Sequence, residues 1–310
     1  MRLVPAQSCP RMPVRMLAFV VALAVVVAVA APRKIDRSAP RKVERSASVA
    51  HPAPDAPLPA NAPALAARLV GAHAGLRAAV AAWRASGQAA PSDEVTLYAL
   101  YVQRALRMLS RDPALAAATV RRLPRPLARE TRDLTIALRD LRRLSAGWRP
   151  HRIRVGAPEA LSVLTTYYRA AQRRFHVGWH VLAAVNHVES AFGRLRNDSV
   201  SGAQGPMQFM PSTWRAYGMG GDVHDPRDAI LGAANYLRHA GAPRSYTRAL
   251  YAYNPSPLYV DAVLRYARLI ARDRDGLSSL YSWQVFVRTA NGGERRITGP
   301  EAARSGAPAR

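Results

Sequence analysis

The apolar residues between positions 65 and 148 recur at helical spacing. Leu65, Leu69, Leu76 and Val80 lie four or seven residues apart, and later leucines continue the pattern. Side chains at these intervals fall on one face of an α-helix. The pattern therefore predicts three or four amphipathic helices, which we expect to serve in packing or in positioning a neighbouring domain.

The rest of the chain has a second helical region and a short tail of a different kind. Residues 149–275 show helical spacing that is interrupted by a long glycine-rich loop. In the tail, apolar residues alternate up to Val287, Asn291-Gly292-Gly293 is a turn sequence, and Arg296 begins a return strand. This order is typical of a β-hairpin. We therefore expect an all-α protein with one short hairpin near the C-terminus, followed by a disordered end.

The N-terminus has the features of an export signal. Three arginines precede an uninterrupted apolar run at residues 16–31, and Ala28-Val29-Ala30 is a cleavage pattern. The run has a length between that of a signal peptide and that of a membrane span, and Pro32 is unfavourable beside a cleavage site. We therefore expect either a cleaved signal peptide or a retained membrane anchor. Both place the rest of the chain outside the membrane.

Residues 32–64 are rich in proline and alanine, which predicts an extended linker without a packed core. Such a spacer allows the domain behind it to reach away from a membrane. The predicted organisation is a leader, a linker, a helical region of unknown role, a second helical domain and a tail, at residues 1–31, 32–64, 65–148, 149–275 and 276–310.

The chain is strongly basic, with 45 Lys and Arg against 20 Asp and Glu and a formal net charge of +25. These basic residues are spread along the whole chain, whereas a nucleic-acid site would concentrate them on one element. The spread fits either a merely arginine-rich composition or attraction to the anionic polymers of a cell envelope. We expect such polymers, and no nucleic acid, as partners. Because Cys9 is the one cysteine, an intrachain disulfide and a cysteine-based zinc site are excluded.

Glu189 is the most informative charged residue of the second helical region. It shares a helical stripe with Leu182, Val185 and Phe192 in the helix predicted at residues 178–192. Burial of a lone carboxyl group on such an apolar face raises its pKa, as a general acid near neutral pH requires. A glutamate at the helix edge, or one paired with an arginine, would have the same spacing, so the pattern alone leaves both interpretations open.

A glycine-rich segment follows this helix. Gly202 and Gly205 allow tight turns and the close approach of a ligand. Gln208 offers both a hydrogen-bond donor and an acceptor, as sugar recognition requires. Pro211 is placed to begin a helix, and a later helix is expected to end at Asn254, before two prolines.

Three motifs in this order resemble the SLT-type lytic transglycosylases, enzymes of the lysozyme-like superfamily that cut peptidoglycan. They are Glu189-Ser190, the stretch GAQGPMQFMPST at residues 202–213, and Ala252-Tyr253-Asn254. The resemblance covers about residues 160–270, and residues 221–226 are similar to the related MltB-like enzymes. It implies a lysozyme-like catalytic domain, an exported enzyme without a cofactor, and peptidoglycan glycan strands as its substrate.

By motif position, the resemblance makes Glu189 the catalytic acid and base. The residues that would line the sugar cleft are Ser199, Met207, Gln208, Tyr253 and Asn254. The chain departs from the family pattern directly after Asn254, where Pro255-Ser256-Pro257 stands in place of small residues.

The implied reaction needs one carboxyl group, as in substrate-assisted glycoside cleavage. Glu189 would protonate the oxygen between N-acetylmuramic acid and N-acetylglucosamine. Its carboxylate would then remove the C6 hydroxyl proton, so that a 1,6-anhydromuramyl end forms. Two alternatives remain: a lysozyme-type hydrolase in which Asp222 activates water, and a wall-binding scaffold without activity. Asp222 also fits the interpretation of an ordinary loop acid.

Several other side chains have a structural as well as a functional interpretation. Asp225, followed by Pro226 and Asp228, is a good helix start. Three histidines lack the spacing of a metal site, so none is expected there: His176, His180 and His187. Three aromatic residues would either stack on sugars or pack in the core: Trp214, Tyr217 and Tyr236.

Overall fold

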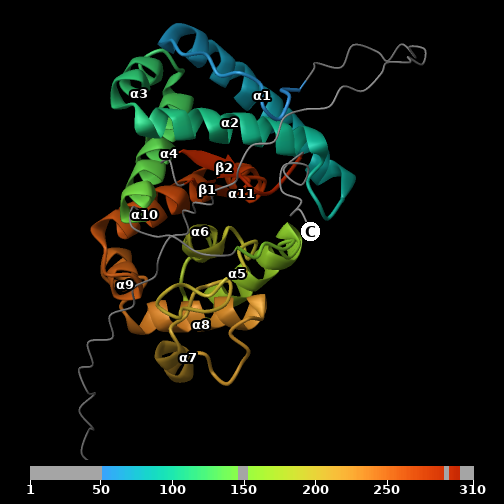
Figure 1. Cartoon of the computed structure of the whole chain (residues 1–310). Helices are drawn as coiled ribbons and strands as arrows, with labels where there is room; N and C mark the ends of the chain where they lie inside the picture. The colour runs from blue at the N-terminus through green and yellow to red at the C-terminus, as the bar shows by residue number, and fades with distance from the viewer. Residues whose placement is uncertain (1–50, 146–152, 290–292, 301–310) are drawn as a thin grey trace, which may run out of the picture.

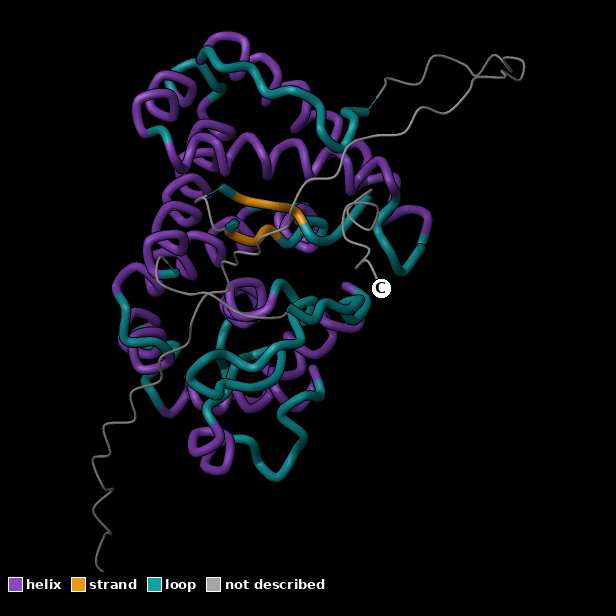
Figure 2. Tube along the Cα trace, in the orientation of Figure 1, coloured by secondary structure: helices purple, strands orange, loops and turns teal. Residues whose placement is uncertain are grey.

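The structure is a computed structural model that describes residues 51–145, 153–289 and 293–300. The described chain is mostly helical and contains a two-stranded antiparallel sheet near its C-terminus, as Figure 2 shows. The expected fold class, all-α with a short C-terminal hairpin, is therefore confirmed.

The first helical region consists of α1 (Ala62–Ser86), α2 (Asp93–Arg111), α3 (Pro113–Val120) and α4 (Arg125–Leu144). The side chains of Asn61, Ser92 and Asp112 cap the first three helices by accepting a hydrogen bond from a backbone N–H of the first turn. The prediction of three or four helices is confirmed. α1 begins earlier than the apolar pattern suggests, because Asn61 is its cap and a proline fits its first turn.

The second helical region contains the helices α5 (Leu161–Phe175), α6 (Trp179–Ser190), α7 (Pro211–Tyr217), α8 (Pro226–His239), α9 (Tyr246–Tyr253), α10 (Pro257–Arg272) and α11 (Gly276–Tyr281). Four boundaries follow the sequence signals. α6 matches the helix that carries Glu189, α7 begins at Pro211, Asp225 caps α8, and α9 ends before Asn254.

The hairpin pairs β1 (Phe286–Arg288) with β2 (Glu294–Arg296), and Val287 lies opposite Arg295. Val287 is buried and packs with Leu195 and Val285 in a small apolar cluster. The hairpin prediction is thus confirmed, although Asn291 and Gly292 of the expected turn lie outside the described residues.

α10 joins the two helical regions, because it packs against α4 of the first and α6 of the second. One cluster of buried apolar residues extends from Ala72 in α1 to Trp283 after α11. In Figure 1, α1 to α3 lie at one end of the molecule, α7 and α8 at the other, and α6, α10, α11 and the hairpin between them. The first region therefore shares a core with the second, which supports a positioning role for it.

The leader and residues 32–50 of the expected linker lie outside the described residues. In the described part of the linker, the carbonyl oxygens of Pro54 and Ala56 accept hydrogen bonds of 3.1 and 2.8 Å from Arg104 of α2. This part of the linker therefore lies against the helical region. None of the helices in the described ranges is long and apolar enough to cross a membrane.

Candidate active site

Glu189 lies in the last turn of α6 and is 1% exposed. Its Oε1 accepts a hydrogen bond of 2.6 Å from the hydroxyl of Tyr259 in α10. Its Oε2 is buried and has no hydrogen-bond partner among the described residues. Of the two interpretations of the sequence, the structure therefore favours a carboxyl group buried on the apolar face, with a tyrosine rather than an arginine beside it.

Burial determines the protonation state of this pair. It raises the pKa of Glu189 to about 8, while the hydrogen bond from Tyr259 acts in the opposite direction. Burial and the neighbouring Glu189 also raise the pKa of Tyr259 well above its usual value. Tyr259 therefore remains a donor to Oε1, and the proton of the neutral carboxyl group belongs on Oε2. Near pH 7, Glu189 is an acid that holds a proton it can transfer.

Sequence reasoning missed Tyr259, because its partner is 70 residues away in the chain. The segment Pro255-Ser256-Pro257, where the sequence departs from the family pattern just before Tyr259, has a structural role. Ser256 caps α10 by accepting a hydrogen bond from the Tyr259 N–H, and Pro257 lies in the first turn. Ser256 and Pro257 thus begin the helix that brings Tyr259 to Glu189. The sequence signals the start of α10, but it does not signal the contact between Tyr259 and Glu189.

Ser190 connects the end of α6 to the segment at residues 191–210, which we call the site loop. Its hydroxyl donates a hydrogen bond of 2.6 Å to the Pro206 carbonyl and accepts one of 2.8 Å from the Gly193 N–H. Ala191, Phe192 and Gly193 all have positive φ, so the chain reverses sharply there. The fully buried Ser190 is therefore a structural part of the motif it shares with Glu189.

Gly205 fixes the course of the site loop. Its φ is +73°, and a Cβ at this position would collide with the carbonyl of Val223. Nearby, the buried hydroxyl of Tyr253 donates a hydrogen bond of 2.6 Å to the Met207 carbonyl. At Gly205 the loop backbone therefore lies directly against the Val223 carbonyl, which is possible because glycine has no Cβ. Tyr253 holds the same loop through the backbone carbonyl of Met207.

Gln208 has a strained backbone, and only the nitrogen of its side-chain amide is hydrogen-bonded within the described residues. Its φ is 51°, and its Nε2 donates hydrogen bonds of 2.9 Å to the Gly205 carbonyl and 3.3 Å to the Asn197 carbonyl. Its buried Oε1 has no partner among the described residues. This oxygen can accept a hydrogen bond from a ligand, while the nitrogen closes the loop.

The other expected cleft residues also support the loop. Ser199 is half-buried, and its Oγ accepts a hydrogen bond of 2.9 Å from the Ala203 N–H. Met207, Tyr253 and Asn254 are buried, and Asn254 ends α9 through a hydrogen bond from its N–H to Leu250. The structure thus brings these residues together around the site loop, and their direct contact with a sugar stays a prediction.

Asp222 lies in the turn before α8. Its Oδ1 accepts a hydrogen bond of 2.9 Å from the His224 N–H, and its own N–H donates to Asp228. These are the contacts of a loop acid. Asp225 caps α8 by accepting a hydrogen bond from the Asp228 N–H, which confirms that prediction.

The aromatic residues of this region pack mainly against one another. Trp214 contacts Phe209 edge-on, and its Nε1 donates to the Gly221 carbonyl. Tyr236 contacts both Tyr217 and Tyr253 and donates to the Ala252 carbonyl. These contacts favour core packing over sugar stacking. The described ranges contain no group of three side chains that could hold a metal ion.

Comparisons with known proteins agree with the motifs. The model of the family described as "Transglycosylase SLT domain" matches residues 166–272. A curated relative, "Membrane-bound lytic murein transglycosylase F" of Thiobacillus denitrificans (strain ATCC 25259 / T1), is 32% identical over 128 residues, which cover 38% of this chain and 26% of the relative. The chain therefore spans about a quarter of the length of that relative. No solved structure matches the chain.

These findings confirm the resemblance for the part of the chain that carries the motifs. Residues 166–272 match the transglycosylase SLT domain, whose fold is lysozyme-like. The matched range begins within α5 and ends with α10, so it includes both Glu189 and Tyr259.

Proposed function

We propose that this protein is a peptidoglycan lytic transglycosylase whose catalytic part is residues 149–275, held in place by the helical region before it. The observation that carries the proposal is the buried Glu189, with a pKa of about 8 and an Oε2 that has no hydrogen-bond partner in the described part of the chain, within the range that matches the SLT domain. A buried neutral carboxyl group with a free oxygen can give its proton to a bound sugar.

The proposed substrate is the β-1,4 bond between N-acetylmuramic acid and N-acetylglucosamine. In the first step, Glu189 Oε2 protonates the bridging oxygen, and the bond from that oxygen to muramyl C1 breaks. The muramyl acetamido group, or an oxocarbenium-like state, carries the charge at C1. The product that leaves is the N-acetylglucosamine end of the glycan strand.

In the second step, the Glu189 carboxylate removes the proton from the muramyl C6 hydroxyl, whose oxygen closes on C1. The products are a 1,6-anhydromuramyl end and a neutral Glu189, and no water is consumed. Tyr259 has a positioning role in both steps, because its hydrogen bond to Oε1 fixes the carboxyl group and stabilises the charged form. Gln208 Oε1, Ser199 and Asn254 are the proposed polar contacts to the sugar.

Two further parts of this proposal concern location and partners. The apolar run at residues 16–31 directs the protein out of the cytoplasm and either is removed or stays as a tether. The net charge of +25 attracts the protein to anionic polymers of the envelope around its glycan substrate.

The test is digestion of purified peptidoglycan followed by mass spectrometry. Transglycosylation gives anhydromuramyl products that are one water lighter than reducing ends. Reducing ends alone would instead identify a hydrolase, and Asp222→Asn should then lose as much activity as Glu189→Gln. Intact peptidoglycan with retained binding would identify a wall-binding scaffold.

Tyr259→Phe tests the positioning role. The hydrogen bond from Tyr259 lowers the pKa of Glu189, so its loss should raise that pKa above about 8. Because the acid must be protonated, the alkaline limb of the kcat/KM profile should move to higher pH. The rate at the optimum should fall by roughly tenfold, which corresponds to one hydrogen bond to a charged group. An unmoved alkaline limb would contradict this role.

A further inference from the structure

Although basic residues are spread along the whole sequence, α4 gathers several of them on one face. Side chains that recur three or four residues apart form what we call the arginine stripe: Arg125, Arg129, Arg132, Ile136, Arg139 and Arg143. At 100° per residue they lie within about 80° of one another around the helix and extend over about 27 Å of its length. Four of the arginines are exposed, and Arg139 is half-buried.

Two acidic residues of α4 are engaged on other sides of the helix. Glu130 lies 3.9 Å from Nδ1 of His73 in α1. Asp133 forms an ion pair with Arg265 of α10. Their negative charges therefore face neighbouring helices and do not offset the charge of the stripe.

The stripe itself is largely unpaired. The third acid of α4, Asp140, is 5% exposed and lies 3.6 Å from Nε of Arg139. In the described ranges, the side chains of Arg125, Arg129 and Arg132 make no ion pair and no hydrogen bond with other residues. The outer face of α4 is therefore a surface of uncompensated positive charge.

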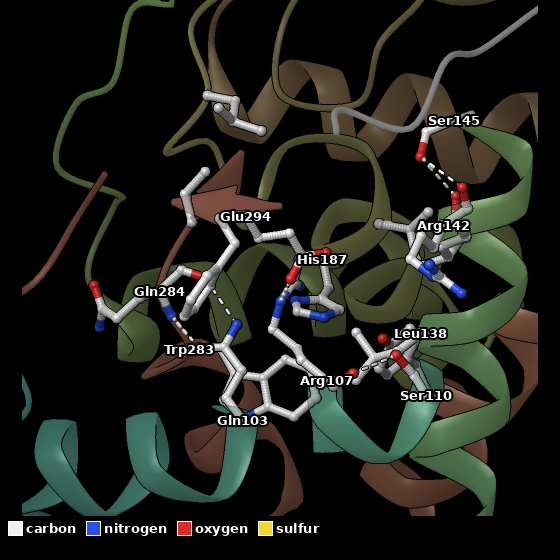
Figure 3. A pocket seen from close by; sticks show the side chains of 17 residues that line it. Gln103, Arg107, Ser110, Leu138, Arg142, Ser145, His187, Trp283, Gln284 and Glu294 are labelled. Carbon is white, nitrogen blue, oxygen red and sulfur yellow. Dashed lines mark hydrogen bonds and ion pairs between the residues drawn. The ribbon is translucent and has the colours of Figure 1, made fainter. Parts of the chain in front are cut away.

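The opposite face of α4 belongs to the interior of the protein. Leu138 and Arg142 line a cavity there together with His187 of α6, as Figure 3 shows. Leu134 and Leu141 of the same face are buried in the shared core. Packing in the core accounts for this inner face but gives no reason for the arginines on the outer one.

A different cavity, of about 280 Å³, opens beside the middle of the stripe. Arg132, Ile136 and Arg139 line it from α4, and Arg121 lines it from the end of α3. Its other walls are mainly apolar and come from α2 and α3: Leu109, Pro113, Ala116, Ala117 and Val120. None of the described residues that line it is acidic. The surface thus combines positive charge with a hollow for an apolar group.

This combination distinguishes between kinds of anionic partner. A hydrophilic polymer such as polyphosphate or a nucleic acid would use the arginines and leave the apolar cavity without a role. An anionic lipid carries both a charged headgroup and hydrocarbon chains. α4 does not insert into a bilayer as an interfacial helix, because the apolar face that insertion requires is already buried in the core. The stripe therefore fits lipid headgroups at the surface of a bilayer.

We propose that the arginine stripe is a docking surface for a membrane that contains anionic phospholipids, and that the cavity beside it receives part of one lipid chain. Each basic residue near an anionic membrane surface strengthens binding roughly fivefold, so the five arginines together hold the domain without insertion. Residues 32–50 span at most about 65 Å when extended, which lets a domain tethered by residues 16–31 reach the same membrane.

Docking through α4 leaves the proposed active site uncovered. No residue of the stripe or of the adjoining cavity belongs to the site loop. In Figure 1, α7 and α8 lie at the end of the molecule opposite α1 to α3. A docked domain can therefore still bind a glycan strand. This last point rests on the proposed function, whereas the contact with lipid does not.

The test places a reporter on the stripe of the full chain, in which Cys9→Ser leaves one introduced cysteine. Arg129→Cys carries an environment-sensitive fluorophore on the stripe. Arg227→Cys carries it on α8 as the matched control, because it also replaces an exposed arginine. Each protein is mixed with vesicles of phosphatidylcholine alone or of phosphatidylcholine and phosphatidylglycerol in equal amounts. The control reporter accounts for any contact that the leader makes with the bilayer.

We expect a blue shift and stronger emission at position 129 with the anionic vesicles. The signal should not change with phosphatidylcholine alone, nor at position 227 with either kind of vesicle. Sodium chloride at ~0.5 M should reverse the shift, because the Debye length then falls to about 4 Å.

Two triple variants, both with the reporter at position 129, test whether the stripe is responsible. The stripe variant combines Arg125→Gln, Arg132→Gln and Arg143→Gln. The control variant removes the same charge from exposed positions of α7, α8 and the turn before α9 by Arg215→Gln, Arg227→Gln and Arg244→Gln. The stripe variant should lower the docking equilibrium constant about 100-fold. The control variant should change it by no more than about twofold, because charges beyond a Debye length are screened. Circular dichroism confirms that both are folded.

Three results would overturn the proposal. A signal at position 129 that is the same with neutral and anionic vesicles would exclude docking on anionic lipid. Equal losses in the two triple variants would mean that the net charge, and not the stripe, attracts the protein. A shift produced by soluble polyphosphate or DNA without vesicles, as large as that with anionic vesicles, would make the stripe a site for hydrophilic polymers. These measurements contain no peptidoglycan, so their failure is distinguishable from a failure of the proposed glycan cleavage.

Discussion

The first helical region and the site loop are stabilised in opposite ways. In residues 62–144, the buried residues are mainly apolar, and the caps made by Asn61 and Asp112 are exposed. In the site loop and the turn of α6 before it, buried Glu189, Ser190 and Gln208 make specific polar contacts, and several residues have left-handed backbone. The packing of the first region depends mainly on apolar pattern and volume, whereas the site loop depends on individual polar atoms.

This difference fits the role proposed for each region. A region that positions others needs burial of apolar surface, which is non-directional. A site that transfers a proton needs a carboxyl group in surroundings that disfavour its charged form. The neighbouring residues must then offset the cost of burying that polar group. Substitution of the carboxyl group should therefore change activity more than stability, whereas substitutions in the supporting structure should change mainly stability.

The largest effect is expected for Glu189→Gln, which keeps the shape of the side chain and removes its titratable proton. Turnover on purified peptidoglycan should fall by about 10²–10⁴-fold or more, because one group serves both proton transfers. The variant should still fold and bind glycan. The assay is release of soluble products, with circular dichroism to confirm folding. Activity equal to that of the native protein would refute the assignment and favour a wall-binding scaffold.

The next effect is expected for Gly205→Ala in the site loop. The new Cβ would meet the Val223 carbonyl, and φ of +73° disfavours an L-residue, so the free energy of unfolding should fall by about 4 kcal/mol. Gly202→Ala is the matched control, because its φ is +84° but nothing lies within 4 Å of its Cβ. It should lose only about 1 kcal/mol. Equal losses in urea denaturation would mean that backbone conformation, and not the Val223 contact, sets the cost.

A third effect concerns the pH dependence of stability. The pKa of Glu189 is about 8 in the folded protein against its usual value of 4.5, so between these values the folded state keeps a proton that the unfolded state releases. Stability should therefore decrease as pH rises through this window, by roughly 3 kcal/mol at pH 7.

Glu189→Gln is the reference for this measurement, because it lacks the titration. The native protein and the variant should differ little in unfolding free energy near pH 4, and the variant should gain as pH rises toward 8. Glu130, whose pKa burial raises to about 7, titrates in both proteins and cancels in the difference. A constant difference across this range would contradict a buried neutral carboxyl group.

The same contrast explains what the sequence predicts and what it does not. Repeating leucines predict α1, α2 and α4, and the Asp225-Pro226 pair predicts the start of α8, because these signals are local. The bond from Tyr259 to Glu189 and the packing of α10 on both regions depend on tertiary arrangement. Motif positions located the candidate acid, but the structural use of Gln208 and Ser199 within the loop became evident only from their backbone contacts.

The smallest effect is expected when the same change, serine to alanine, is made once in each region. Ser92→Ala removes the half-buried cap of α2 and should cost about 1 kcal/mol, the usual cost of a lost N-cap. Ser190→Ala leaves the Pro206 carbonyl and the Gly193 N–H without their shared hydroxyl inside the protein, so it should cost about 2–4 kcal/mol. Urea denaturation of both variants at one pH gives the two values. If the costs were the same, the site loop would not depend on buried polar contacts more than the helical region does, and the contrast drawn between them would fail. A larger cost for Ser190→Ala, with the denaturant dependence of the unfolding free energy unchanged, would place the difference in the folded state.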